Sequence, residues 1–201
     1  YQFYHPPLFH LLAALTVSAY EALSGVTDYA AALEAAKLVS CCASILTLFA
    51  ALRLCRELGL SGRGTLPAMA LAAFLPNHYL LSGRVNNDAL SIFFMTMILC
   101  DTLQWYRTRR WRPLLRLALE FGLGMMTKMS VAALALVTGG VMLIALWQAL
   151  RQRRARPLVR QFAAFAVIAF PLGLWYPLRN YRLFGQPLTY VYPIQLTSKL
   201  Y

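Results

Sequence analysis

The sequence predicts an all-α polytopic integral membrane protein, a helical bundle of about six transmembrane helices plus one outer juxtamembrane helix. Apolar residues make up 60% of the 201 residues and charged residues only 13%, whereas globular domains are about 45–50% apolar even with glycine counted. The mean hydropathy is +0.56. The apolar runs are long and do not alternate with the period of two that marks a half-buried strand.

A helix needs about 20 mostly apolar residues to cross a bilayer. Candidate helices cover 8–24, 29–53, 66–83, 88–106, 113–127, 129–150 and 157–178. They form a single transmembrane domain over 1–201, with an outer juxtamembrane segment 1–28, transmembrane helices 29–178 and an outer loop 179–201. The segment 8–24 is short and follows two prolines, so its residues either span the membrane or lie along its surface.

The net charge of +12 would by itself favour a nucleic-acid partner. The positions of the charges exclude that partner, because most arginines occupy short links between apolar segments, as in cytoplasmic loops. The three clusters are Arg53, Arg56 and Arg63; Arg107, Arg109, Arg110, Arg112 and Arg116; and Arg151, Arg153, Arg154, Arg156 and Arg160. Placing all three inside gives the helices alternating directions without contradiction. The outer side then carries sparse charges of both signs at helix ends.

A polar turn, "SGRVNNDALSIFF" (82–94), falls on this outer side. An Asn or Asp at a helix N-cap accepts a hydrogen bond from a free backbone N–H, which accounts for one of Asn86, Asn87 and Asp88 but not for all three beside Arg84. We therefore expect this turn to be part of a site. Asp88 is the candidate catalytic carboxylate, acting as a base, binding a metal or orienting Arg84, and the asparagines shape the site.

Further basic residues share the outer side. Lys128 interrupts an apolar stretch from 117 to 147, and is either a phosphate ligand or a lysine that snorkels to the interface. Arg179 and Asn180 follow the last helix, where the arginine binds a phosphate or a lipid headgroup. His5 and His78 show no metal-ligand spacing, so no metal residue is assigned.

Four motifs occur in an order and spacing that resemble a known superfamily: "HPPLFHLL" (5–12), "GRVNNDALSIFF" (83–94), "GLGMMTKMS" (122–130) and "WYPLRNYRLFGQPL" (175–188). Together they resemble the GT-C polytopic glycosyltransferases, and within them the bacterial family 39 group of protein O-mannosyltransferase-like and aminoarabinose transferase-like enzymes. The chain looks like a fragment of such an enzyme, without the first transmembrane helix, the acidic motif of the first outer loop and the C-terminal part.

The resemblance implies an enzyme of the bacterial inner membrane that takes a sugar from a polyprenyl-phosphate donor on the extracytoplasmic side. The acceptor is a lipid, a glycan or a protein, and membrane lipids surround the bundle. His5 and Lys128 would bind the donor phosphate, with Arg84 and Arg179 as further candidates and Asn180 and His78 shaping the site.

The resemblance also bears on the base and on a metal. The expected base belongs to the acidic motif that such enzymes carry ahead of the prolines, which would place it upstream of Tyr1, the first residue of this chain. Tyr4-His5 stands where aminoarabinose transferase-like members have Glu-Lys, so a divalent metal is left open.

Two alternatives compete with this interpretation. A transporter or lipid flippase without glycosyl transfer also places polar residues in membrane helices, near the bilayer midplane. A non-enzymatic scaffold predicts no convergence of the outer polar residues. The enzyme predicts that these side chains meet in one outward-facing cavity: His5, Arg84, Asp88, Lys128 and Arg179.

Overall fold

The structure is a computed structural model that describes residues 6–187. Over this stretch the chain forms α-helices joined by short turns and one 3₁₀ segment, and contains no strand. The elements are α1 (Leu8–Ser24), α2 (Tyr29–Glu57), α3 (Gly62–Phe74), α4 (Pro76–Ser82), α5 (Asn87–Thr108), α6 (Trp111–Thr127), the 3₁₀ segment η1 (Met129–Ala133), α7 (Leu134–Arg151) and α8 (Arg156–Phe184). The all-α class expected from composition is confirmed for the described residues.

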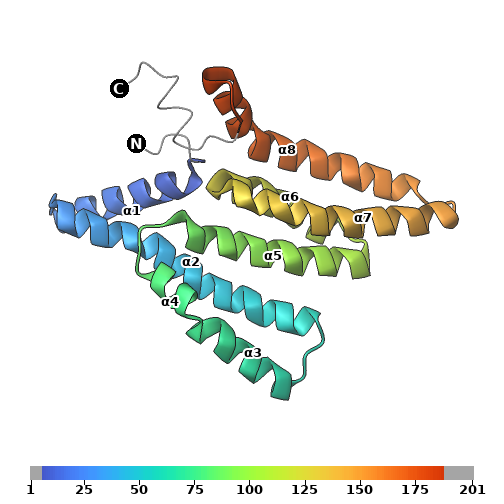
Figure 1. Cartoon of the computed structure of the whole chain (residues 1–201), viewed down its shortest axis with the longest axis horizontal. Coiled ribbons are helices and arrows are strands. Elements are labelled where there is room, and N and C mark those ends of the chain that lie inside the picture. Colours follow the sequence, from blue (N-terminus) through green and yellow to red (C-terminus); the bar gives the residue numbers. More distant parts are fainter. Residues whose placement is uncertain (1–5, 188–201) are drawn as a thin grey trace.

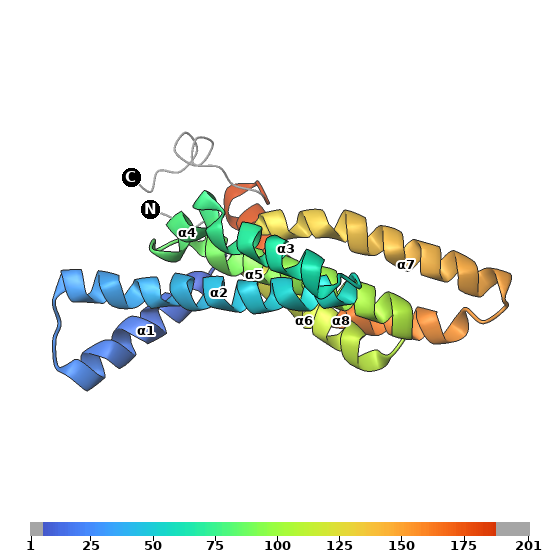
Figure 2. The same ribbon diagram turned by 90° about the horizontal axis from the view of Figure 1, so that it is seen from below.

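Helix α5 lies at the centre of the bundle. Figure 1 shows α2 on one side of α5 and α6 on the other, with α8 beyond α6. Helices α1, α3 and α4 pack against α2, and α7 packs against α5. Figure 2 shows the α1–α2 connection at one end of the molecule and the α7–α8 connection at the opposite end.

Within the described residues, four helical stretches are long and apolar enough to cross a membrane: α2, α5, the joined η1–α7 segment and α8. About six were expected. Helix α6 has 17 residues and carries Arg116 and Glu120, and the expected span 66–83 is divided in two. Large apolar side chains such as Phe74 (85% exposed) and Leu136 (83% exposed) face outward, which is the arrangement that lipid solvates. These features describe an integral membrane protein.

The division between α3 and α4 falls at Leu75 and Pro76. Leu75 has an extended backbone, with φ −61° and ψ 121°, and Pro76 is the first residue of α4. A proline disfavours the helical conformation of the residue before it, yet its own fixed φ suits the first turn of a helix. The expectation of one continuous helix over 66–83 is therefore wrong.

Helix α8 continues six residues beyond the expected end at 178 and stops at Gly185, which adopts a left-handed conformation with φ 72°. Pro171 and Pro177 lie inside it, and Figure 1 shows that the helix bends toward its C-terminal end. A proline inside a helix removes one backbone hydrogen bond and crowds the preceding turn. The result here is a bend in the helix rather than its end. Residues 179 to 184 are thus helical, and the expected outer loop beginning at 179 is wrong at this boundary.

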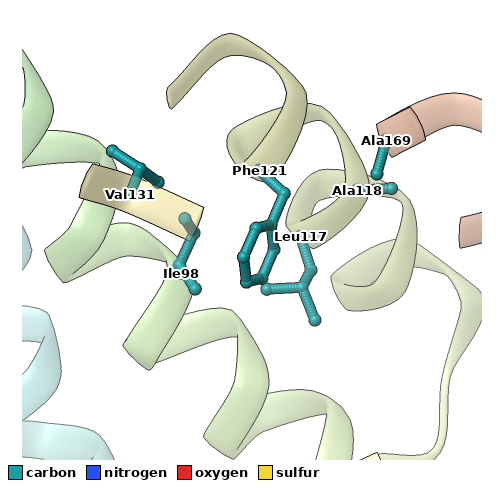
Figure 3. Close-up of a cluster of buried hydrophobic side chains, with 6 residues drawn as sticks. All are labelled: Ile98, Leu117, Ala118, Phe121, Val131 and Ala169. Atoms are coloured by element: carbon teal, nitrogen blue, oxygen red, sulfur yellow. The ribbon is translucent and has the colours of Figure 1, made fainter. Parts of the chain in front are cut away.

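The core is built between α5, α6, η1 and α8. Figure 3 shows a buried apolar cluster in which Ile98 of α5 and Val131 of η1 face side chains of α6. Helices α6 and α8 approach closely because glycines meet bulky residues there. A methyl group on Gly122 would lie 2.5 Å from Leu172 Cβ, and one on Gly173 would lie 2.8 Å from Met125 Sδ. These contacts lie in the last two turns of α6, which Lys128 follows.

The arginine clusters lie at one end of the bundle. Arg107 of α5 pairs with Glu57 of α2 at 3.4 Å. Arg109, in the α5–α6 turn, lies with its guanidinium over the Trp105 and Tyr106 rings and donates to Gln148 of α7. Burial lowers the pKa of Arg109 below its ordinary value, against a smaller opposing effect of Tyr106. The shared end confirms the grouping on which the expected topology rests.

Candidate functional site

The polar turn before α5 is a capped helix start. Asn86 has an extended backbone and its Oδ1 accepts a hydrogen bond of 2.9 Å from the backbone N–H of Asp88. Asn86 is therefore the N-cap, so capping accounts for one of the three polar residues as expected, and the helix begins at Asn87 rather than at Asp88. Asp88 lies in the first turn, where the helix dipole favours a negative charge, and its Oδ2 accepts from Asn86 Nδ2 at 3.0 Å. Its second oxygen is left to face α6.

That second oxygen binds Lys128. The Lys128 ammonium donates to Asp88 Oδ1 across the α5–α6 interface, and the two side chains are 34% and 31% exposed. Lys128 follows the last residue of α6 with an extended backbone, and its N–H donates to Gly124 O at 2.9 Å. Its backbone turn therefore directs the side chain back toward α5. The prediction that Lys128 occupies a tight turn between two helices is confirmed.

Two further hydrogen bonds hold this turn against its neighbours. Asn87 Nδ2 donates to the backbone carbonyl of Thr127 at 3.3 Å. Ser40 of α2 donates to the backbone carbonyl of Asn86 at 3.1 Å and accepts from its N–H at 3.4 Å. Helices α2, α5 and α6 are thus tied together beside the ion pair. Ser40 was not expected from the sequence, because a hydroxyl residue in an apolar helix more often bonds its own backbone, as Thr127 Oγ1 does by donating to Leu123 O at 3.0 Å.

The remaining expected site residues do not all join the pair. Arg179 donates to Asn180 Oδ1 at 3.1 Å and lies over the Tyr176 ring, and Asn180 is buried. Because Gly173 contacts Met125, this part of α8 lies at the Lys128 end of α6. Among residues 6–187, no hydrogen bond or ion pair links Arg179 to Asp88 or Lys128.

Two further expected site residues, Arg84 and His78, lie before α5 in the chain. Arg84 is exposed in the turn between α4 and α5, with its backbone N–H donating to Leu81 O at 3.3 Å. His78 is partly exposed on α4. The expected convergence therefore holds for Asp88 and Lys128, and stays a prediction for the other members.

Two expectations fall on the start of the chain. His5, the expected phosphate ligand, and Tyr1, upstream of which the catalytic base is expected, both lie outside the described residues. The phosphate role of His5 and the position of the base upstream of Tyr1 therefore stay predictions. Among the described residues, Asp88 is the only carboxylate that the sequence predicted for the site, and it is bound to Lys128.

An apolar cavity of about 360 Å³ opens between α6, α7 and α8. Its lining includes Met125 and Ala132, which flank Lys128 along the chain, and Gly139 and Phe170 farther away. The cavity has an almost entirely apolar lining, and neither Asp88 nor Lys128 belongs to it. It was not expected from the sequence, because the pattern of apolar residues does not show where two neighbouring helices diverge.

The described part of the chain contains no group of three or more His, Cys, Asp or Glu side chains that could hold a metal ion. Asp88 is already engaged by Lys128, and a cationic neighbour disfavours a divalent metal at the same carboxylate. The residues in place here do not fit a metal site. An ammonium that is one-third exposed and held by a carboxylate can instead stabilise a bound anion with its remaining N–H donors.

The sequence was compared with known protein families, curated proteins and solved structures. Residues 4–175 match the family model described as dolichyl-phosphate-mannose-protein mannosyltransferase. No curated protein and no solved structure matches the chain.

Proposed function

The chain belongs to the dolichyl-phosphate-mannose-protein mannosyltransferase family, and on that basis we propose that it transfers a sugar from a polyprenyl-phosphate donor to an acceptor on the extracytoplasmic side of the membrane. Membership implies a glycosyltransferase that depends on a lipid-linked sugar. This favours glycosyl transfer over the transporter or flippase alternative. The acceptor in this proposal is a lipid, a glycan or a protein, and the membrane is the bacterial inner membrane.

The observation that carries the proposal for this chain is the Asp88–Lys128 pair, beside which the chain lines an apolar cavity with residues a few positions before and after Lys128. A polyprenyl-phosphate sugar has one charged group between a sugar and a long hydrocarbon chain. It needs a cation at the membrane surface with an apolar path beside it. Lys128 offers the cation, and the cavity between α6, α7 and α8, whose lining includes Met125 and Ala132, offers the apolar path.

In the proposed reaction an acceptor oxygen attacks the anomeric carbon of the sugar. The bond between that carbon and the phosphate oxygen breaks, the phosphate keeps the electron pair, and the acceptor proton passes to a carboxylate base. Fixed cations in a partly dry site stabilise the charge that develops on the leaving phosphate. Lys128 has this role, with His5, Arg84 and Arg179 as further phosphate ligands.

Asp88 is assigned to organising the site. Both of its carboxylate oxygens are engaged, one by Lys128 and the other by Asn86, so it holds the ammonium in place rather than accepting the acceptor proton. The base in this proposal is the acidic residue that the resemblance places upstream of Tyr1. Asn86, Asn87, His78 and Asn180 shape the surrounding surface.

The proposal is tested with the full-length protein in sealed vesicles of known orientation. We expect labelled sugar to pass from added polyprenyl-phosphate mannose to an acceptor only when the extracytoplasmic face is accessible to both substrates. Vesicles that carry the Lys128→Ala protein are the control for transfer by other enzymes. Transfer that requires the cytoplasmic face would contradict the proposed side, and donor movement across the membrane without transfer would favour a flippase.

A further inference from the structure

One turn of α5, far from the Asp88–Lys128 pair, makes polar contacts with four other helices. We call Asp101, Thr102 and Trp105 the α5 hub; all three are buried, with Asp101 and Trp105 at 0% exposure and Thr102 at 2%. Asp101 binds α2 and α6, Thr102 binds α7, and Trp105 binds α8. Helices α2, α6, α7 and α8 are therefore all bonded to the same turn.

The strongest part of the hub is the Asp101 carboxylate. Arg116 of α6 donates to it through Nε and Nη2, both at 2.8 Å, and Arg53 of α2 donates to it through Nη2. Gln104 Oε1 accepts from both arginines. A bidentate contact between a guanidinium and a carboxylate fixes the relative orientation of the two groups as well as pairing their charges. Asp101 therefore determines how α2 and α6 are placed along α5.

The other hub contacts are single hydrogen bonds. Thr102 Oγ1 and Thr138 Oγ1 of α7 are 2.9 Å apart. Trp105 Nε1 donates to Gln161 Oε1 of α8 at 2.9 Å, and Gln161 Nε2 donates to Arg109 O at 2.8 Å. A polar group inside a membrane protein has little water to replace a lost partner. These contacts therefore oppose any sliding of α7 or α8 that would break them.

The helices joined by Asp101 are the ones that carry the candidate site at their other ends. Along α5, Asp101 lies 13 residues after Asp88, and along α6, Arg116 lies 12 residues before Lys128. At about 1.5 Å per residue these separations correspond to about 20 Å of helix. An axial shift of α5 against α6 at the hub is thus carried to the Asp88–Lys128 contact, because a helix transmits displacement along its axis.

Apolar packing restrains an axial shift of α5 against α6 less than the contact between Asp101 and Arg116 does. The buried cluster near the site pairs Phe9 of α1 with small and apolar residues such as Ala43 and Ala89. Apolar contacts tolerate a modest sliding of one helix along another, whereas a bidentate guanidinium contact does not. The hub therefore adds directional restraint that the apolar cluster lacks.

We propose that the α5 hub is a positioning element that sets the register of α2, α5 and α6, and so holds Asp88 against Lys128. This inference rests on the proposed function of that pair. The hub touches no substrate, and it acts only through the geometry of the site about 20 Å away.

The experiment is a double-mutant cycle in the full-length enzyme, with kcat/KM for a polyprenyl-phosphate mannose donor as the measured quantity. The proteins are wild type, Asp101→Asn, Asp88→Asn and the double variant. Distant sites without shared partners give independent effects. We expect Asp101→Asn to lower kcat/KM about tenfold in the wild-type background but less than about twofold when Asp88→Asn has already broken the contact.

The matched control is Arg112→Gln, which removes an exposed arginine one turn before Arg116 on the same helix and should leave kcat/KM unchanged. Arg116→Lys keeps the charge but loses the two-pronged contact, so it repeats the test with a milder change if Asp101→Asn yields too little folded protein. Equal losses from the hub variant in both backgrounds, or no loss in either, would overturn the positioning role. An inactive wild-type enzyme or an unaffected Asp88→Asn single variant would instead contradict the proposed function, which the inference needs.

Discussion

Lys128 at the end of α6 donates to the carboxylate of Asp88 in the first turn of α5, and the two residues are separated by 40 positions in the chain. The contact joins two antiparallel helices at the end of the bundle opposite the arginine clusters. Each side chain is about one-third exposed, so the pair is open to a ligand. Its value to stability is correspondingly small, about 0–1 kcal/mol for an ion pair that water reaches.

Replacing Lys128 with alanine should weaken use of the lipid-linked donor. The phosphate would lose its cation, and a hydrogen bond to a charged group contributes about 1.5–3 kcal/mol, so we expect kcat/KM for the donor to fall roughly tenfold to a hundredfold. Steady-state kinetics of the full-length enzyme measures this. Lys37→Ala is the matched control, because Lys37 pairs with Glu34 on the surface of α2. Unchanged turnover and donor affinity in Lys128→Ala would remove Lys128 from the mechanism.

Replacing Asp88 with asparagine preserves the size of the side chain but removes its charge. Because Asn86 rather than Asp88 caps α5, we expect the free energy of unfolding to change by less than about 1 kcal/mol. Donor turnover should fall about tenfold or more, since the ammonium of Lys128 is no longer held. Chemical denaturation and transfer kinetics separate the two quantities. A large loss of stability with normal turnover per folded molecule would show that Asp88 has only a structural role.

Filling the apolar cavity should discriminate donors by the length of their hydrocarbon chain. Gly139 lines the cavity, and a Cβ atom built on it meets no atom within 4 Å, so we expect the ring in Gly139→Phe to enter the space. We expect KM for a long-chain donor to rise several-fold and KM for a short-chain analogue to change little, because only the long chain needs the cavity. Each buried methylene that is displaced costs about 0.8 kcal/mol.

Gly140→Phe is the control for the cavity variant. The neighbouring glycine also has open space around it but is not part of the cavity lining. It should leave the KM values of both donors at their wild-type levels. Equal effects of the two substitutions, or equal effects on the two donors, would argue against a hydrocarbon chain in this cavity.

Adding a methyl group at Gly124 should destabilise the turn that carries Lys128. The new Cβ would lie 2.8 Å from Val131 Cγ1 and 3.1 Å from Phe94 Cβ, and overpacking of this kind costs about 1–3 kcal/mol. Gly140→Ala, in open space on a helix, should instead be neutral or stabilising by about 0.5–1 kcal/mol. Thermal unfolding in detergent compares the two. A Gly124→Ala protein as stable as Gly140→Ala would show that the turn adjusts freely.

Much of the fold was predictable from the sequence. Long apolar runs and the arginine clusters locate the helices and group the connections at one end, and Lys128 in an apolar stretch marks a turn. The break at Leu75 was missed although Pro76 was visible, because a proline is compatible with a bent helix as well as with two helices. The extension of α8 beyond Pro177 was missed for the same reason.

The site was predictable only in part. The polar residues at helix starts indicated Asp88 and Lys128 separately, but neither periodicity nor composition shows which helices are neighbours. Their pairing, the contact of Ser40 with Asn86, and the hub at Asp101 depend on tertiary packing. Asp101 did leave a signal, since a carboxylate inside an apolar helix needs a partner, but the sequence alone does not choose between the arginines.

The contacts of the α5 hub also impose an order on biogenesis. Arg53 precedes Asp101 by 48 residues, and Gln161 follows Trp105 by 56, so α2 leaves the ribosome before its carboxylate partner exists. Until α5 follows, the Arg53 guanidinium lacks the carboxylate and amide groups that accept its hydrogen bonds in the folded chain. The bond between α5 and α8 closes only when Gln161 of α8 has been synthesised, so it is the last of the hub contacts to be completed.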